Sequence, residues 1–545
     1  MKLSELLKTV TVKRAIVLIT GNSMQTQEIE KKDQLRLDPE IASIHYKAQD
    51  VKPSGLFVAI PGLTTDGHHF IDEAFLKGAS TIVCQKSAGL PRMNQRDGYE
   101  VKKDSIIIEV ENTRKALAAI SSRFYGNPSE SLFIIGITGT NGKTTTAFFI
   151  ESILKKAGLN VGVIGTINYH YSGKTYKNPM TTPESLDLQR ILADMQKKGI
   201  THVVMEVSSH GIDLFRIDNC QIDLGVFTNL SQDHLDYHKD MNSYWECKKR
   251  LFTENLNSGP KKGRTTAVIN CDDAKGKELL RLLPISSLTT GYSNNNMIWP
   301  KHFKIDMTGI VGKISTPDGD FEFKSTIVGK HNLENILSAT GVGFALNIPL
   351  KTLKDGIEEI SSIPGRLESI PNDSDKFIYV DYAHTPDALE NVLNSLKSLT
   401  SNRIICVFGC GGDRDKEKRP QMGEIAGRLC DLAIITSDNP RTEMPMEIIS
   451  QIIQGTIKVS SHEYTPSELA TGFNKKGYVV EQDRRKAIRL GIKVSQPGDI
   501  VLIAGKGHED YQIIGNKTVS FDDRDEARQA LSQEAISSRR TATNH

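Results

Sequence analysis

Short β-branched runs alternate with stretches of helical spacing along most of the chain. Residues 134–137, 161–164 and 202–207 are apolar runs of strand length, and residues 185–197 carry apolar side chains at helical intervals. Four further apolar runs follow, at 377–380, 403–408, 432–435 and 500–504. Strands that alternate with helices predict parallel βαβ units with ligands at the carboxyl ends of the strands. The pattern therefore predicts an α/β protein.

Turn clusters divide this pattern into three parts. The Gly-Asn-Pro-Ser cluster at 126–129 precedes the apolar run at 134, and Ile-Pro-Gly-Arg at 363–366 is typical of a hinge. A length of 545 residues favours roughly three or four domains. We expect three, at residues 1–130, 131–360 and 361–545. Within the last, residues 455–480 have the composition of a polar insertion.

Composition narrows the class of protein. Lys and Arg number 68 against 66 Asp and Glu, a formal net charge of +2, so nothing favours a nucleic-acid or membrane surface. The seven cysteines are scattered and odd in number, as expected of reduced core thiols. Charged residues interrupt every early apolar run, and no leader or spanning helix is predicted. We expect a cytoplasmic enzyme.

The segment at 134–146 joins a strand to a helix through a glycine-rich turn. Such a turn frees backbone N–H groups for phosphate, while Lys143 reaches the outer phosphates and Thr144 can hold Mg²⁺. An ordinary Walker loop has glycine where Ile137 stands, so this phosphate loop is shortened. The alternative is a turn that opens an ordinary helix. The predicted ATP-binding residues are Gly139, Thr140, Asn141, Gly142, Lys143, Thr144 and Thr145.

Three other residues are candidates for the functional site, and each of them also has a purely structural interpretation. Glu206 ends a strand, where a carboxylate can hold a cation over the phosphate loop, although such a residue is often solvated. Asp233 opens a group of Asp and His residues after the run 224–227, and it could equally be a helix N-cap. Lys248 lies in a basic run that is typical of a solvated helix face.

Taken together, these segments resemble the Mur ligase family, whose members form amide bonds with ATP in the peptidoglycan stem peptide. The motifs that carry the resemblance are TGTNGKT (138–144), MEVSSH (205–210), DHLDYH (233–238), HNLEN (331–335), PGRLE (364–368) and DYAHTPD (381–387). They stand in family order and span nearly the whole chain. The resemblance implies a UDP-binding N-terminal domain, a central P-loop parallel-sheet ATPase domain and a Rossmann-like C-terminal domain.

The same resemblance implies roles for single residues. Mg²⁺ would lie among Thr144, Glu206 and His234, and Lys248 would be carbamylated by CO₂, which places an anion beside the metal. Asn332 and Asp381 would contact the nucleotide, and Arg366 would neutralise phosphate charge. Lys143, Lys248 and Arg366 would form the catalytic set. The residues implied for UDP-MurNAc-L-Ala-D-Glu are Thr181, Thr182, Ser208, Arg216 and Lys248.

The C-terminal motifs resemble those of the family branch that adds the third residue, meso-diaminopimelate. This amino acid has a second carboxylate, which a guanidinium binds through two hydrogen bonds, whereas lysine ends in an ammonium alone. Read without the family, residues 438–441 are only a turn. The implied binding residues are Arg414, Asp438, Asn439, Pro440, Arg441, Gly505 and Glu509. The reaction would pass through an acyl phosphate, in an enzyme that we expect to be a monomer.

Two positions depart from the family pattern. Ala48 stands where a hydroxyl usually binds the UDP portion, and Leu214 replaces a usual Gln. The alternatives are a folylpolyglutamate synthase, which would lack the N-terminal UDP domain, and a Mur ligase that adds another residue. The third alternative is a binding protein that responds to nucleotide but has no catalytic activity.

Overall fold

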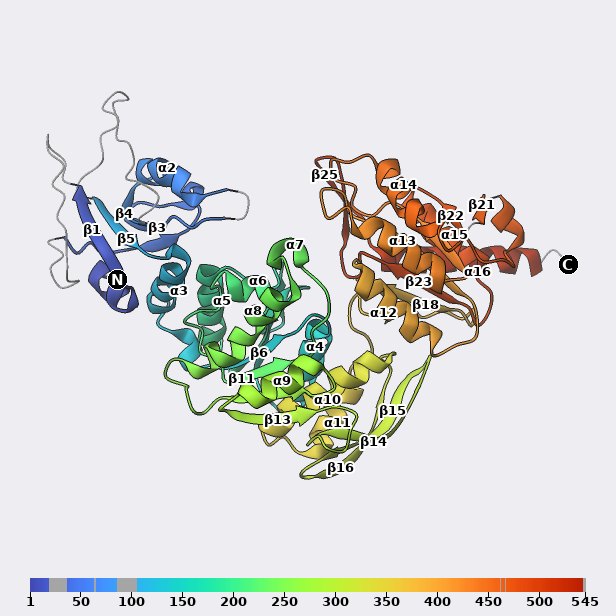
Figure 1. The fold of residues 1–545 in the computed structure, drawn as a ribbon, viewed down its shortest axis with the longest axis horizontal. Helices are drawn as coiled ribbons and strands as arrows, with labels where there is room; N and C mark the ends of the chain where they lie inside the picture. Colours follow the sequence, from blue (N-terminus) through green and yellow to red (C-terminus); the bar gives the residue numbers. More distant parts are fainter. Residues whose placement is uncertain (19–36, 63–64, 86–104, 461, 466, 543–545) are drawn as a thin grey trace.

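The computed structural model describes residues 1–18, 37–62, 65–85, 105–460, 462–465 and 467–542. Three lobes follow one another along the chain, and the N-terminal and C-terminal lobes lie on opposite sides of the central one (Figure 1). Their sheets occupy residues 12–110, 133–325 and 368–520. The domain limits at 130 and 360 stay a prediction.

The N-terminal lobe is built on a five-stranded sheet. Its strands run β1 (Val12–Leu18), β5 (Ser105–Val110), β4 (Ala79–Gln85), β3 (Gly55–Val58) and β2 (Ser43–His45), and only β1 is antiparallel to its neighbour. Successive residues of a strand point to opposite faces, so Leu56 and Phe57 enter two separate apolar cores. Its helices are α1 (Leu3–Leu6), α2 (Ile71–Leu76) and α3 (Thr113–Phe124).

The central lobe contains an eight-stranded sheet in the order β13-β12-β11-β6-β10-β7-β8-β9. Six strands are parallel, as predicted: β6 (Phe133–Thr138), β7 (Val161–Ile164), β10 (His202–Glu206), β11 (Leu224–Phe227), β12 (Thr266–Asn270) and β13 (Ser286–Thr290). At one edge the sheet continues in β8 (Tyr169–Tyr171) and β9 (Lys174–Tyr176), which form an antiparallel hairpin that the sequence analysis did not predict. A two-residue turn permits only that direction.

Helices cover this sheet, and a second sheet lies beside it. The helices are α4 (Lys143–Lys156), α5 (Ser185–Lys197), α6 (Ser209–Asp213), α7 (Leu235–His238), α8 (Met241–Thr253), α9 (Ala274–Leu282), α10 (Lys330–Ala345) and α11 (Leu350–Glu358). The second sheet is antiparallel: β14 (Trp299–Asp306), β15 (Gly309–Thr316) and β16 (Gly319–Ser325). Its inner face joins the core that α4 and α10 share.

The C-terminal lobe has a seven-stranded sheet in the order β17-β18-β23-β19-β20-β22-β21. The interpretation of residues 455–480 as a polar insertion is wrong, because β21 and β22 continue the sheet and Leu469 and Phe473 are buried in its core. The strands are β17 (Glu368–Ser369), β18 (Phe377–Asp381), β19 (Ile404–Phe408), β20 (Leu432–Ile435), β21 (Glu463–Tyr464), β22 (Gly477–Val480) and β23 (Ile500–Ala504). A hairpin of β24 (Tyr511–Ile514) and β25 (Lys517–Ser520) follows, and the helices are α12 (Pro386–Lys397), α13 (Lys418–Leu429), α14 (Pro445–Thr456), α15 (Arg484–Val494) and α16 (Asp523–Ala542).

Two expectations from composition concern the whole chain. All seven cysteines are free and buried, which confirms the prediction of reduced core thiols. In the ranges that the structure describes, no helix combines the length and the apolar composition needed to cross a membrane.

Candidate active site

The phosphate loop connects the carboxyl end of β6 to the first turn of α4, as the sequence predicted. Gly139 has φ 149°, and a Cβ there would lie 1.9 Å from Thr228 Oγ1. Gly142 has φ 85°, and a Cβ there would lie 2.3 Å from Asn335 Oδ1. The side chain of Thr228, just after β11, and that of Asn335, on α10, therefore fix the loop from two sides, and glycine is needed at both positions.

Two lysines meet at this loop. Lys143 Nζ donates to Thr140 O at 2.8 Å and to Gly139 O at 3.0 Å, while Lys248 Nζ donates to the same Gly139 O at 2.8 Å. Burial lowers the pKa of Lys143, and the Glu206 carboxylate opposes that shift. Burial, and then the Lys143 charge, hold the pKa of Lys248 well below its usual value. Lys248 is 1% exposed, so the interpretation as a solvated helix face is wrong.

Glu206 lies directly beside the first turn of α4. Its Oε2 accepts hydrogen bonds from Thr144 Oγ1 at 3.0 Å and from Thr166 Oγ1 at 2.9 Å, and its Oε1 accepts one from Thr166 N at 2.9 Å. Arg366, from the start of the C-terminal lobe, donates to Thr144 Oγ1 at 3.4 Å. Glu206 is 1% exposed, which excludes the solvated alternative. A hydroxyl and a carboxylate over a phosphate loop suit a hard cation such as Mg²⁺.

His234 is the third residue predicted to hold the cation. It is the N-cap of α7, in the left-handed region at φ 53°, and its ring lies 5.0 Å from that of His210. Asp233 is not the helix N-cap; its Oδ1 accepts the His234 N–H at 2.8 Å. Among the described residues, no three His, Cys, Asp or Glu side chains converge as a metal-ligand group. The structure thus brings Thr144 and Glu206 together, and it places His234 beside Asp233 and His210.

A row of hydroxyls continues from Glu206 toward the N-terminal lobe. Thr166 Oγ1 lies 3.0 Å from Thr181 Oγ1, and Thr182 Oγ1 lies 3.1 Å from Ser208 Oγ. Arg216 donates to Thr182 O at 3.1 Å and lies on the same side of the sheet. Four of the five residues predicted for the sugar-peptide substrate are therefore neighbours, and the fifth, Lys248, lies at the phosphate loop. Leu214 is the C-cap of α6 beside them.

The two residues predicted for the nucleotide have well-defined partners. Asn332 is 2% exposed and donates to Val328 O at 2.7 Å at the start of α10. Asp381 accepts the backbone N–H groups of Leu367 at 2.7 Å and Ala383 at 2.8 Å. Burial raises the pKa of Asp381, against the effect of the Arg366 charge.

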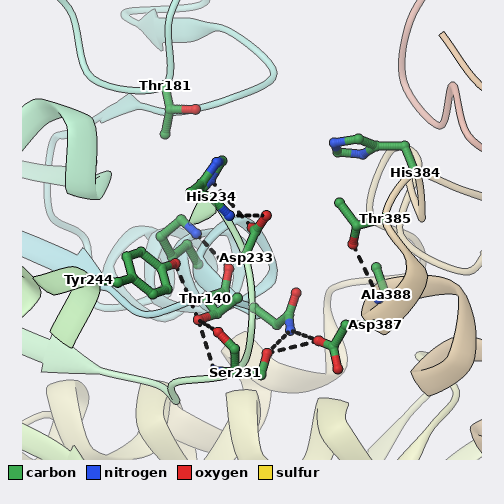
Figure 2. Close-up of polar contacts among 12 residues, drawn as sticks. Thr140, Thr181, Ser231, Asp233, His234, Tyr244, His384, Thr385, Asp387 and Ala388 are labelled. Carbon is green, nitrogen blue, oxygen red and sulfur yellow. Dashed lines mark hydrogen bonds and ion pairs between the residues drawn. The ribbon is translucent and has the colours of Figure 1, made fainter. Parts of the chain in front are cut away.

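A polar contact joins the phosphate loop to the C-terminal lobe. Asp387, at the start of α12, accepts hydrogen bonds from Ser231 Oγ at 2.8 Å and Asn141 Nδ2 at 3.4 Å. Ser231 N in turn donates to Thr140 Oγ1 at 3.0 Å, and Tyr244 OH lies 3.3 Å from the same oxygen. Figure 2 shows these side chains converging from both lobes.

The residues predicted for the amino acid gather at the carboxyl ends of β20 and β23. Asp438 and Asn439 are 6% and 5% exposed, and Asn439 Nδ2 donates to Glu509 Oε2 at 2.9 Å. These contacts exclude the interpretation of residues 438–441 as only a turn. Arg441 donates to Gly412 O at 2.7 Å.

Arg414, Pro440 and Gly505 are the remaining residues predicted for the amino acid. A Cβ built on Gly411 would lie 2.9 Å from Arg441 Nη1 and 3.8 Å from Arg414 Cγ, so both arginines lie against the same loop. Pro440 precedes Arg441, and a Cβ on Gly505 would lie 3.0 Å from Asp438 Oδ2.

Sequence reasoning missed three residues of these groups. Thr166 binds Glu206 through two atoms, Asp387 links the lobes, and Lys506 is fully buried among Asp438, Asn439 and Glu509. Asp387 lies inside the DYAHTPD motif, and Lys506 lies between Gly505 and Glu509, which were both predicted for the amino acid; these positions were the available signal. Thr166 follows an apolar run with no motif of its own, and only the parallel pairing of β7 with β10 brings it to Glu206.

Comparisons with known proteins agree with this geometry. Residues 40–125 match the Mur ligase family catalytic domain, residues 137–343 the Mur ligase middle domain, and residues 365–507 the Mur ligase glutamate ligase domain. The chain belongs to the Mur ligase family. Its three lobes each contain one of these matches, which confirms the resemblance and the fold class.

Several relatives of this chain share one name. The UDP-N-acetylmuramoyl-L-alanyl-D-glutamate–2,6-diaminopimelate ligase of Geobacter metallireducens is 46% identical, over 90% of this chain and 94% of its own. The ligase of that name from Clostridium botulinum is 41% identical, over 89% and 94%. A solved structure with this name is 31% identical, with a TM-score of 0.61, over 91% and 95%. A folylpolyglutamate synthase of Mycobacterium tuberculosis, 16% identical with a TM-score of 0.59, covers 76% of this chain and shares the fold.

Proposed function

We propose that this chain is an ATP-dependent ligase that joins meso-diaminopimelate to UDP-MurNAc-L-Ala-D-Glu in peptidoglycan precursor synthesis. The observation that carries the proposal is the name shared by relatives at 41–46% identity over about nine-tenths of the chain. The buried Asp438–Asn439 pair beside Glu509 supports it, since polar groups at the carboxyl ends of parallel strands suit a charged ligand. A folylpolyglutamate synthase is disfavoured by the match of residues 40–125 to a Mur ligase domain.

The ATP phosphates would lie on the loop from Gly139 to Thr145, with Lys143 turned from the loop carbonyls onto the phosphates. Asn332 and Asp381 would contact the nucleotide, and Arg366 would balance phosphate charge from the C-terminal lobe. Donors that are already in place stabilise the charge of the transferring phosphoryl group without reorganisation.

Mg²⁺ would be held by Thr144 and Glu206, with His234 approaching when the cation is bound. One carboxylate, one hydroxyl, phosphate oxygens and waters satisfy the oxygen preference of this cation. Bound there, Mg²⁺ would supply positive charge that offsets the charge of the ATP phosphates.

Lys248 would carry the carbamate. Its lowered pKa supports this, because only a neutral amine adds to CO₂, which gives a carbamate anion and releases one proton. The amine lies 2.8 Å from Gly139 O, beside the place that the cation would occupy, and a carbamate there would attract the cation instead of repelling it.

The sugar-peptide substrate would bind along Thr181, Thr182, Ser208 and Arg216, which brings its D-glutamate γ-carboxylate toward Glu206 and Lys248. This carboxylate would attack the γ-phosphorus of ATP and release ADP. The hydroxyl that Ala48 lacks would be replaced by other contacts in the N-terminal lobe.

Diaminopimelate would bind to the C-terminal lobe, with Arg414 and Arg441 on its distal carboxylate. Asp438, Asn439 and Glu509 would receive the distal ammonium, and Pro440 and Gly505 would shape the walls. The free amine would attack the acyl phosphate, and the tetrahedral intermediate would expel phosphate to leave the amide. The enzyme would act as a cytoplasmic monomer.

Phosphate release and product mass test the proposal. With ATP, Mg²⁺ and UDP-MurNAc-L-Ala-D-Glu, we expect release to require meso-diaminopimelate and the product to be the corresponding tripeptide. Faster release with lysine would overturn the substrate assignment. Release without any amino acid would favour a simple ATPase, and no release with any amino acid would favour the non-catalytic binding protein.

A further inference from the structure

Lys506 is a fully buried lysine in the loop after β23. Its side chain is 0% exposed, and its Nζ lies 3.0 Å from Glu509 Oε2, 3.3 Å from Asn439 Oδ1 and 3.7 Å from Asp438 Oδ1. Lysine is almost never fully buried unless it is paired. Its three partners are the residues assigned above to the distal ammonium of the substrate.

The ammonium of Lys506 determines how the Asn439 amide is oriented. Asn439 Oδ1 accepts hydrogen bonds from Lys506 Nζ and from Ile513 N at 3.0 Å, which leaves Nδ2 to donate to Glu509 Oε2 at 2.9 Å. A flipped amide would place its NH₂ group against two donors and its oxygen against a carboxylate. Buried groups left without partners in this way are costly, so one orientation is fixed.

Lys506 also sets the charge of the group. Asp438 and Glu509 contribute two negative charges and Lys506 one positive charge, so one negative charge remains. Asp438 Oδ1 is buried and accepts no hydrogen bond from the described residues. A single substrate ammonium would balance the remaining charge and supply the missing donor.

We propose that Lys506 is a specificity-determining positioning residue, which orients Asn439 and Glu509 and leaves the pocket one negative charge for the distal ammonium of diaminopimelate. This inference rests on the proposed function. An amino acid that has the distal carboxylate but lacks the distal amine, such as 2-aminopimelate, is rejected because it leaves the charge unbalanced.

The test compares Lys506→Met with the parent and with Lys517→Met, a change at an exposed lysine of the neighbouring hairpin. We expect Lys506→Met to raise the KM for meso-diaminopimelate about 10- to 100-fold, the range of a lost charged hydrogen bond. The KM values for ATP and the UDP-dipeptide stay unchanged, and the preference for meso-diaminopimelate over 2-aminopimelate rises at least 10-fold, because two uncompensated carboxylates then face the position of the distal ammonium. An unchanged preference, or an equal rise in all three KM values, overturns the inference.

A second pair of variants applies if Lys506→Met does not fold, as judged by thermal unfolding. Lys506→Met combined with Asp438→Asn removes one of the two uncompensated charges and is compared with Asp438→Asn alone. The double variant keeps one net negative charge in the group whereas Asp438→Asn alone keeps none, so we expect the double variant to discriminate at least 10-fold more between the two amino acids, and equal discrimination overturns the inference. A parent enzyme that fails to join meso-diaminopimelate refutes the proposed function itself, before any variant is compared.

Discussion

Replacing Glu206 with Gln should separate the charge of this residue from its structural contacts. Gln is isosteric with Glu, and Thr166 N fixes which end of the amide faces it, because a backbone N–H needs the amide oxygen at the Oε1 position. The amide NH₂ then lies where Oε2 lay, facing the hydroxyls of Thr144 and Thr166. Hydroxyls can rotate to accept, so all three contacts survive.

The expected magnitudes follow from these contacts. Hydrogen bonds to a charged group contribute about 1 kcal/mol more than neutral ones, so three weakened contacts cost at most about 3 kcal/mol of unfolding free energy. Release of a buried, partly uncompensated charge offsets part of that cost. Catalysis should suffer more, since the carboxylate that contacts Thr144 loses its charge, and we expect phosphate release to fall about 100- to 1,000-fold.

Phosphate release should be measured against Mg²⁺ concentration, with Glu130→Gln, a change at an exposed position, as the matched control. We expect the half-saturating Mg²⁺ concentration to rise at least 10-fold in Glu206→Gln and to stay constant in the control. A folded Glu206→Gln enzyme that works at the parent rate and Mg²⁺ requirement would refute the role assigned to this carboxylate.

Three further predictions concern other sites. Arg441→Ala should lower the preference for meso-diaminopimelate over lysine about 10- to 100-fold in kcat/KM, through loss of a charged hydrogen-bond pair, and an unaltered ratio would contradict this. Depletion of CO₂ should slow the parent enzyme and bicarbonate should restore it, whereas Lys248→Met should be slow in both; a parent indifferent to bicarbonate would exclude the carbamate. Burial, and then the Asp272 charge, raise the pKa of Glu334 from 4.5 to about 7, so the unfolded chain releases its proton first and stability should decline as pH rises between these values. Glu334→Gln should remove that decline, seen as a melting-temperature difference from the parent that grows between pH 5 and pH 8, and a constant difference would count against it.

The regular parts of the fold were predictable because local patterns coincide with tertiary burial. The apolar runs 161–164, 224–227 and 432–435 are strands with these limits, and 185–197 is a helix. The antiparallel sheet of β14–β16 and the strands within 455–480 were not, since their alternating or short apolar positions resemble loops until the neighbouring strand is known.

The residues of the candidate site were predictable where they belong to sequence motifs. They were ambiguous where only burial distinguishes a site residue from a solvated one. Sequence alone left Glu206 and Lys248 as possible solvated residues, and only the pairing of β10 with β6 and the packing of α8 bury them to 1% exposure. Lys506 lies between Gly505 and Glu509, which were both predicted for the amino acid, yet its contact with Asn439 joins loops that are 67 residues apart. Such long-range electrostatics has no local signature.

The central claim is that the γ-carboxylate of the UDP-dipeptide is phosphorylated and then captured by the amine of meso-diaminopimelate. It is tested most directly with UDP-dipeptide that carries ¹⁸O in this carboxylate, by mass spectrometry of the released phosphate. Because the carboxylate oxygen bridges to phosphorus and leaves with it, we predict one ¹⁸O atom in each phosphate released. Unlabelled phosphate formed together with the tripeptide would contradict the account.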